Sequence, residues 1–228
     1  MKKPAIPSLS AAFAVLLAFV SLLLGASFTQ AAENVLSDAE KTDGFELIFN
    51  GQNLDGWRGD TKGYVVEDGV IVCKPGGNLY LPKDYKNFVI RFDFQVPPDG
   101  NNGLGIRAEM GKDAAYYGME IQILDDYAAC YQTLQPYQYH GSIYGVVPVK
   151  RGFTKPAGQW NSEEVMADGG HIRVTINGEV VTDADISEIK ETMDHRDHPG
   201  LHNESGAIGF LGHGAKVQFK NVRVKVLD

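Results

Sequence analysis

The amino-acid sequence predicts an all-β fold, an antiparallel β-sandwich built as one domain. Beyond Thr42, apolar and polar residues alternate with a period of two over several short segments, which is the pattern of half-buried strands. Turn-forming residues recur about every 8–12 positions, and helical periodicity is weak, so only residues 186–193 could form a short surface helix. With 228 residues, 43% of them hydrophobic, the chain can bury one substantial core.

The first expected strands are short and joined by tight turns. Residues 46–49 form an apolar segment, and residues 64–67 and 70–73 flank Asp68-Gly69. An Asp-Gly pair between two alternating segments is a strong hairpin signal, because both residues tolerate a positive φ. Residues 87–94 alternate regularly and place four large apolar side chains on one face of a further strand.

A second hairpin and the last strand come later in the chain. Residues 171–176 and 179–182 flank Asn177-Gly178, which is again a two-residue hairpin turn. Residues 217–226 alternate as a final strand with an irregularity near Asn221. Long loops are expected over residues 127–139 and 151–158. Long loops on a β-sandwich commonly carry its function.

Residues 1–32 differ in composition from the rest and are expected to form a signal peptide. Lys2 and Lys3 precede an almost entirely apolar stretch over 11–28, and small residues follow up to Ala32. This is the export pattern, although an apolar stretch of this length could also remain as an uncleaved membrane anchor. We expect cleavage, which leaves residues 33–228 as a single exported domain in the periplasm or outside the cell.

Charge and cysteine content limit the classes of partner. Lys and Arg number 21 against 29 Asp and Glu, a net charge of −8. Without a basic cluster the chain lacks the charge that nucleic-acid binding needs, so neither nucleic acid nor an anionic membrane surface is an expected partner. Cys73 and Cys130 could pair in an oxidising compartment or remain free thiols.

Polar residues face away from an apolar stripe in three strand-like segments. These residues are Arg107 and Glu109, Glu120 and Gln122, and Ser142 and Tyr144. Side chains two positions apart share a face of a strand, so each pair should stand side by side. Such a face could be a sugar-binding groove, since hydroxyl groups need matched donors and acceptors; the alternative is a solvated sheet face.

A set of motifs in order resembles the 3-keto-disaccharide hydrolase domain family, formerly a domain of unknown function. The motifs are FELIFNGQNLDGW at 45–57, NNGLGIR at 101–107, YYGMEIQILDD at 116–126, GSIYG at 141–145, GQWN at 158–161, GFLGHG at 209–214 and VQFKNVRVKVL at 217–227. Many members have Asn-Ser-Gly at the second motif and Leu-Gln-Asp-His-Gly at the sixth, where this chain differs. The resemblance implies a jelly-roll sandwich of the concanavalin A-like superfamily with a concave, ligand-binding sheet.

The resemblance also implies cleavage of glycosides that are oxidised at C3 of the sugar. A C3 ketone acidifies the proton on C2, so that a base can remove it and the enolate can expel the leaving group at C1. Water then adds to give the 3-keto sugar. This chemistry needs a general base, an electrophile for the enolate oxygen and an acid for the leaving group.

Carried over by motif, seven residues form the expected site. Glu120 is the expected base or a metal ligand, Arg107 would stabilise the enolate or bind hydroxyl groups, and His213 would shuttle a proton. The expected substrate-binding residues are Asn102, Gln122, Tyr144 and Trp160. A structural ion pair of Glu120 with Arg107, and a loop histidine without a chemical role, are the alternatives.

Cofactor signals are weak. No Gly-rich phosphate loop opens a helix and no Gly-x-Ser-x-Gly nucleophile motif occurs. Glu120, Asp125 and His213 could form a site for Ca²⁺ or Mn²⁺. The cluster of His195, His198 and His202 is interrupted by Pro-Gly and is better interpreted as a solvated loop than as a metal site.

Two other functions fit the same scaffold. An ordinary jelly-roll endo-glycosidase would use Glu120 and Asp125, but their spacing places them on opposite faces of a regular strand unless a bulge intervenes. A non-catalytic carbohydrate-binding module of laminin-G type would stack sugar rings on exposed aromatic residues. Turnover of a 3-keto glycoside would separate these functions from the one that the resemblance implies.

Overall fold

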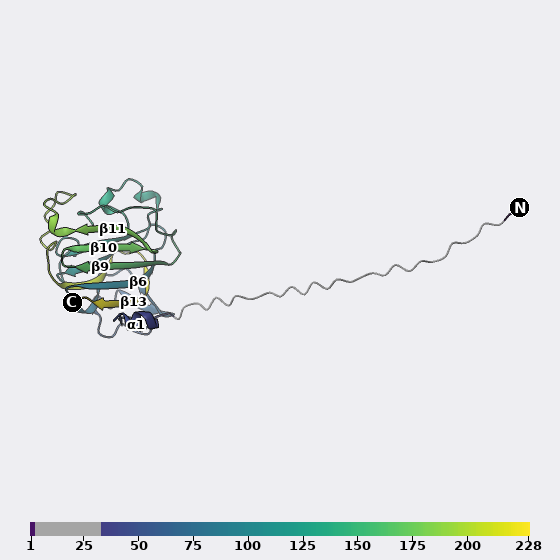
Figure 1. Cartoon of the computed structure of the whole chain (residues 1–228), viewed down its shortest axis with the longest axis horizontal. Helices are drawn as coiled ribbons and strands as arrows, with labels where there is room; N and C mark the ends of the chain where they lie inside the picture. The colour runs from purple at the N-terminus through teal and green to yellow at the C-terminus, as the bar shows by residue number, and fades with distance from the viewer. Residues whose placement is uncertain (3–32) are drawn as a thin grey trace. The chain divides into compact units, whose positions relative to one another are not determined.

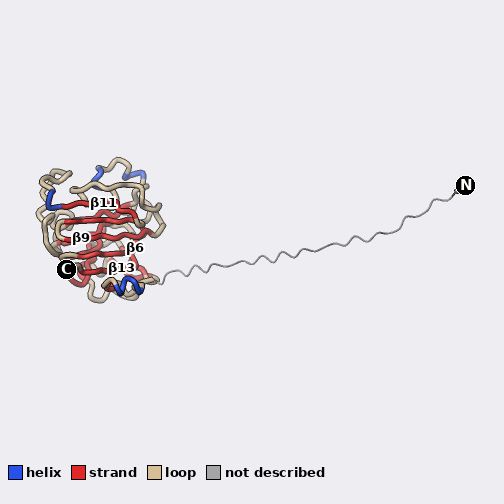
Figure 2. Tube along the Cα trace, viewed as in Figure 1, coloured by secondary structure: helices blue, strands red, loops and turns tan. Residues whose placement is uncertain are grey.

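Two antiparallel sheets lie face to face in the computed structural model (Figure 1), which describes residues 1–2 and 33–228. The segment that we interpret as a signal peptide lies almost wholly outside the described residues. Helices contribute little: α1 (Asp38–Thr42) and the 3₁₀ turns η1 (Ala129–Tyr131), η2 (Pro136–Gln138) and η3 (Ile186–Glu188) lie outside the strands (Figure 2). The all-β prediction is therefore confirmed.

The larger sheet has eight strands, in the order β11-β10-β9-β6-β13-β4-β3, with β1 paired to β13. Figure 1 shows β11, β10, β9, β6 and β13 following one another across the front of the molecule. The bounds are β1 Glu46–Leu47, β3 Tyr64–Glu67, β4 Val70–Cys73, β6 Phe88–Gln95, β9 Asn161–Asp168, β10 His171–Ile176, β11 Glu179–Asp185 and β13 Gln218–Val226.

The smaller sheet has five strands in the order β2-β5-β12-β7-β8. Their bounds are β2 Arg58–Gly59, β5 Asn78–Tyr85, β7 Asn101–Ala108, β8 Met119–Leu124 and β12 Gly206–Gly212. Beyond β8, residues 143–147 extend this edge, because Ile143 forms an isolated bridge with Ile121. This edge borders the candidate site.

The core fills the space between the two sheets. The inward side chains of β6, from Phe88 to Phe94, are fully buried, as are Leu104 and Ile121 on the facing sheet. Phe210 of β12 stacks on Phe219 of β13 with ring centroids 3.7 Å apart, so aromatic packing joins the sheets directly. Strict alternation along the strands produces this separation into an inner and an outer face.

Most of the expected strands are confirmed. The two predicted hairpins are β3–β4 and β10–β11, and the irregularity in the last strand is a register shift between Lys220 and Arg223, with Asn221 at φ 55°. The expected helix over 186–193 is limited to one turn, η3, since so short a segment gains few helical hydrogen bonds.

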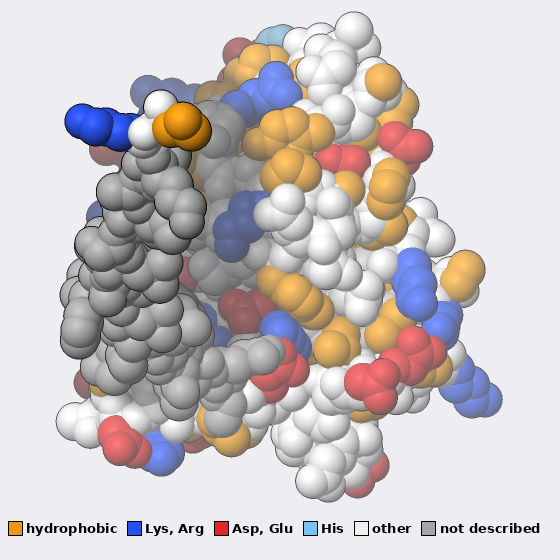
Figure 3. Space-filling view, turned by 90° about the vertical axis from the view of Figure 1, so that its right-hand side faces the viewer, with side chains coloured by type: hydrophobic (Ala, Val, Ile, Leu, Met, Phe, Trp, Pro, Cys, Tyr) orange, Lys and Arg blue, Asp and Glu red, His pale blue; other side chains and the backbone are white. Residues whose placement is uncertain are grey.

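Several surface properties bear on partners. Cys73 is buried and Cys130 is exposed, and both are free thiols. Basic and acidic side chains are interspersed over the part of the surface that described residues form in Figure 3. Among the described residues, no helix has the length and hydropathy needed to cross a membrane.

Candidate active site

The outer face of the five-stranded sheet carries the candidate site. Along β8, alternate residues point into the core, which leaves Glu120 and Gln122 on the outer face. Their partners on β7 are Gly105 and Gly103 respectively. Glycine in the middle of a strand lets another group approach the backbone closely, and here that group is the side chain of Glu120.

Glu120 lies across Gly103 and beside Tyr144. A Cβ atom added to Gly103 would lie 2.7 Å from Cδ of Glu120, so only glycine leaves room for this carboxylate. On the other side of β8, the backbone N–H of Tyr144 donates to the carbonyl of Glu120 at 2.9 Å. The structure thus brings Glu120, Gln122 and Tyr144 together at one edge of the sheet.

His213 covers the carboxylate of Glu120. It follows the last residue of β12, and its Nε2 lies 3.5 Å from Oε1 of Glu120. The two side chains differ in exposure, 46% for His213 and 6% for Glu120. His213 is therefore the member of the pair that is more accessible from the outer face of the sheet.

The two groups shift each other's protonation. Burial raises the pKa of Glu120, and His213 only partly offsets this effect. The contact with Glu120 raises the pKa of His213, against the opposing effect of burial. Asp113, in the loop before β8, acts on both groups and raises both pKa values. Because the two groups interact closely, they titrate as a pair.

Asp113 is a member of this neighbourhood that sequence reasoning missed. Its Oδ1 accepts from the backbone N–H of Ala115, and this turn places Ala114 against Leu211 on the outer face of the sheet. No sequence signal distinguishes Asp113 from the other exposed carboxylates of loops. Its presence gives the groove a second, exposed acidic group.

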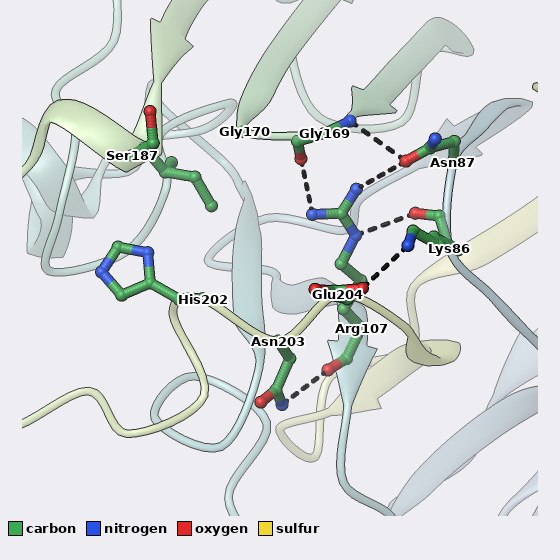
Figure 4. A pocket seen from close by; sticks show the side chains of 10 residues that line it. Lys86, Asn87, Arg107, Gly169, Gly170, Ser187, His202, Asn203 and Glu204 are labelled. Carbon is green, nitrogen blue, oxygen red and sulfur yellow. Dashed lines mark hydrogen bonds and ion pairs between the residues drawn. The ribbon is translucent and has the colours of Figure 1, made fainter.

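Arg107 does not share the face of Glu120, so the expectation that both open onto one groove is wrong. Arg107 has φ 48° and lies where β12 shifts register against β7, and the resulting bulge turns its side chain away. The guanidinium donates to the carbonyls of Lys86 and Gly169 and to Oδ1 of Asn87 (Figure 4). It therefore ties β7 to the β5–β6 connection between the two sheets and to the β9–β10 turn of the larger sheet.

Figure 4 shows the open space beside Arg107, at the end of the sandwich. This cavity has a volume of about 330 Å³ and lies between the Gly169-Gly170 turn, η3 and residues 202–204. At its rim, Lys86 pairs with Glu204 at 2.8 Å. Glu120 and His213 are not among its lining residues, so the cavity is separate from the Glu120–His213 pair.

Two of the expected substrate-binding residues also lie elsewhere. Asn102 is fully buried on the inner face of β7, in line with Leu104, and its Oδ1 accepts from the N–H of Gly103. Trp160 precedes β9 of the larger sheet, where Nζ of Lys220 lies 4.2 Å from its ring centroid. Neither side chain can contact a ligand beside Glu120 in this arrangement.

The expected metal ligands are not assembled. Asp125 accepts from the backbone N–H groups of Asp99 and Tyr127 and so fixes the turns around it. In the described part of the chain, no group of three or more His, Cys, Asp or Glu residues could hold a metal ion. The loop of three histidines is not uniformly solvated as expected, since His198 is buried.

The described features define a lectin-like β-sandwich with a carboxylate–histidine pair on the outer face of its smaller sheet. A Bacillus subtilis protein of unknown function with a galectin-like fold shares this architecture, with a TM-score of 0.50 at 13% identity over 86% of this chain and 94% of that chain. The chain belongs to the 3-keto-alpha-glucoside-1,2-lyase-like domain family, whose model matches residues 44–225.

Two relatives support this assignment. A 3-keto-disaccharide hydrolase of Bacteroides thetaiotaomicron is 27% identical over an alignment that covers 82% of this chain and 79% of the relative. A crystal structure from Parabacteroides distasonis, of a protein provisionally named a glycosyl hydrolase, is 31% identical with a TM-score of 0.73 and covers 86% of this chain and 100% of that chain. The resemblance noted from the motifs is thereby confirmed.

Proposed function

We propose that the groove around Glu120 and His213 cleaves glycosides that carry a ketone at C3, by elimination across C2 and C1 followed by addition of water. Membership of the 3-keto-alpha-glucoside-1,2-lyase-like family supports the substrate class. The observation that carries the proposal is the contact of a buried carboxylate with a half-exposed histidine. Such a pair can remove and return a proton.

Within the pair, we assign the proton transfer to His213 and the supporting role to Glu120. Sequence reasoning gave the base to Glu120, but the greater exposure of His213 favours the reverse. Nε2 of His213 faces Glu120, so an Nε2–H tautomer leaves the lone pair of Nδ1 for the substrate. Glu120 then stabilises the imidazolium that forms when Nδ1 accepts the proton.

The bonds change in three steps. The C2–H bond breaks, its proton moves to Nδ1 of His213, and its electrons form the enolate of the C3 ketone. The enolate collapses to the ketone, a double bond forms between C1 and C2, and the C1–O bond breaks as the imidazolium returns its proton to the leaving oxygen. Water then adds across C1 and C2 and gives the free 3-keto sugar.

Tyr144 is the proposed donor to the enolate oxygen, the role that sequence reasoning gave to Arg107. Its phenol oxygen accepts a hydrogen bond from Nε2 of Gln138 at 3.1 Å. A phenol has one proton to donate, and that proton is not used in this contact. Tyr144 also stands directly beside Glu120 across the sheet edge.

The first test compares a 3-keto α-glucoside with the unoxidised glucoside and follows exchange of the C2 proton with solvent deuterium. We expect turnover and exchange only with the ketone-bearing substrate. Equal cleavage of both sugars would indicate an ordinary glycosidase instead, and binding without turnover would indicate a carbohydrate-binding module.

The second test separates the roles of the two residues by a pH profile. If His213 is the base, the rate rises with pH through its raised pKa, because only the neutral ring accepts a proton. Glu120→Gln removes the main cause of that raised pKa, so the acid limb should move to lower pH while the plateau falls. A Glu120→Gln protein without activity at any pH would return the base to Glu120. Glu109→Gln, which changes an exposed carboxylate nearby, is the control.

A further inference from the structure

Residues 191–204, which we call the crossing segment, connect two segments that border the candidate site and that we call its walls. The N–H of Asp194 donates to the carbonyl of Gly145 at 3.0 Å, and the N–H of Gly200 donates to the carbonyl of Tyr116 at 2.9 Å. The approach is close, since a Cβ on Gly200 would lie 2.6 Å from Cα of Tyr117. The segment therefore packs on the backbone of both walls.

Both walls lie close to Glu120. One is the loop of residues 113–117, whose Asp113 acts electrostatically on Glu120 and His213. The other is Tyr144-Gly145, whose backbone pairs with that of Glu120. The crossing segment lies against both walls but is adjacent in sequence to neither.

His198 is the buried centre of the crossing segment, with 1% of its side chain exposed. Its Nε2 lies 3.1 Å from both carboxylate oxygens of Asp194, and its Nδ1 lies 3.1 Å from the carbonyl oxygen of Ala115. Carboxylate and carbonyl oxygens only accept hydrogen bonds, so both ring nitrogens must donate. Only the imidazolium form satisfies both contacts.

Tyr116 and Asp194 lie against the His198 ring. The Tyr116 ring packs on His198 with centroids 4.7 Å apart. The guanidinium of Arg196 lies over the Tyr116 ring, 4.2 Å from its centroid, and contacts the Tyr116 hydroxyl. Burial alone would raise the pKa of Asp194. The hydrogen bond from the backbone N–H of Arg196 and the contact with the His198 side chain lower this pKa below its ordinary value. The carboxylate is thus ionised beside the ring.

Gly145 gives the pair its space. A Cβ on Gly145 would lie 2.6 Å from Oδ2 of Asp194 and 2.9 Å from Cε1 of His198. The glycine also has φ 76°, a conformation that other residues rarely adopt. The absence of a side chain at Gly145 therefore leaves space for Asp194 and His198 beside Tyr144.

We propose that the His198–Asp194 ion pair is a clasp that holds Tyr144 and the 113–117 loop in position around the Glu120–His213 pair. Both members are positioning residues, since neither touches the groove. This inference rests on the proposed function of the groove. It extends that function to a pair of residues that act through Tyr144 and Ala115 rather than on the substrate.

The charge state of His198 is tested in the wild-type protein by ¹⁵N NMR of the histidine rings at neutral pH. We expect both nitrogens of His198 to give the signals of a protonated imidazolium. A neutral His198 ring at neutral pH would overturn the proposal. This measurement needs no substrate, so it stands even if the proposed function of the groove fails.

The positioning role is tested with His198→Gln, and His195→Gln is the matched control. His195 lies on the same segment but is exposed, and its ring pairs with Glu191. An amide at 198 can donate to Asp194 but cannot also donate along the ring axis to Ala115. We expect kcat for a 3-keto α-glucoside to fall about tenfold to a hundredfold, with KM changed much less, and the control to match wild type.

Hydrogen exchange separates positioning from general destabilisation. In His198→Gln, the Tyr144 amide should exchange faster, while amides of β6 and β9 keep their protection. If His198→Gln does not fold, Asp194→Asn provides the same readouts with the ring retained. Unchanged kcat and unchanged Tyr144 exchange in a folded variant would overturn the clasp, as would equal loss of protection throughout both sheets.

Discussion

Gly103→Ala should inactivate the protein while leaving the fold intact. The added Cβ would overlap Oε1 of Glu120 and lie 2.7 Å from its Cδ, whereas ordinary contacts begin at 3.4 Å, so Cδ must retreat by at least 0.7 Å and Oε1 by more. A displacement of about 1 Å in a catalytic group can cost about 10²-fold in rate. We therefore expect kcat/KM for a 3-keto α-glucoside to fall by about that factor.

The fold should tolerate the same change. Gly103 does not have a positive φ, and the carboxylate that must move is the free end of a flexible side chain. Alanine is preferred over glycine within a strand by roughly 0.5–1 kcal/mol, which offsets part of the crowding. The melting temperature should stay within a few degrees of wild type.

Gly105→Ala is the matched control for this prediction. Its Cβ would lie 3.1 Å from Leu211 and 3.2 Å from Ala114, so it crowds apolar neighbours rather than Glu120. We expect the control to keep most of its activity. Wild-type kcat/KM in Gly103→Ala would refute the reasoning, and so would a loss of activity that follows unfolding in a thermal melt.

Three further predictions concern Arg107, Glu163 and the N-terminal segment. Arg107→Met should lower the free energy of unfolding by roughly 2–4 kcal/mol, because charged hydrogen bonds to two turns are lost, but kcat/KM of the folded fraction should change little; a large loss of kcat/KM would return Arg107 to the groove. Glu163 is buried 3.5 Å from His140, and burial raises its pKa, so the folded state binds the Glu163 proton more tightly than the unfolded state does. The free energy of unfolding should therefore fall as the pH rises from the ordinary pKa of 4.5 through the raised pKa of the folded state. Denaturant melts of Glu163→Gln should lack this decline. We also propose export, for which N-terminal sequencing of the secreted protein should begin near Ala32, and recovery of intact Met1 with membranes would contradict it.

Alternation along a regular strand made the location of Glu120 predictable. β8 has no bulge, so period-two reasoning correctly placed Glu120 and Gln122 opposite the apolar stripe. The same reasoning failed for Arg107, because a register shift two residues beyond Gly105 ends the alternation. A bulge depends on how the partner strand β12 pairs, and such pairing between distant segments leaves no local mark in the sequence.

The predicted surroundings of two further residues, Asn102 and His198, also differ from those in the structure. Asn102 was expected to bind substrate because it belongs to a motif, but its position in line with Leu104 directs it into the core. His198 was interpreted as part of a solvated loop, since nothing nearby in sequence reveals Asp194, Ala115 and Gly145 converging on one ring. Alternation along β7 decided the first case, and contacts with Ala115 and Gly145, far away in sequence, decided the second.

Asp125 does not provide the second carboxyl group that an ordinary retaining glycosidase on this scaffold would need. A retaining glycosidase needs two carboxyl groups about 5–5.5 Å apart that share the work of acid and nucleophile. Asp125, the second carboxylate suggested by spacing, is held by the N–H groups of Asp99 and Tyr127, and Glu120 is covered by His213. In the elimination that we propose, one group can take the C2 proton and return it to the leaving oxygen, and we assign this task to His213 supported by Glu120, with Tyr144 as the donor to the enolate oxygen.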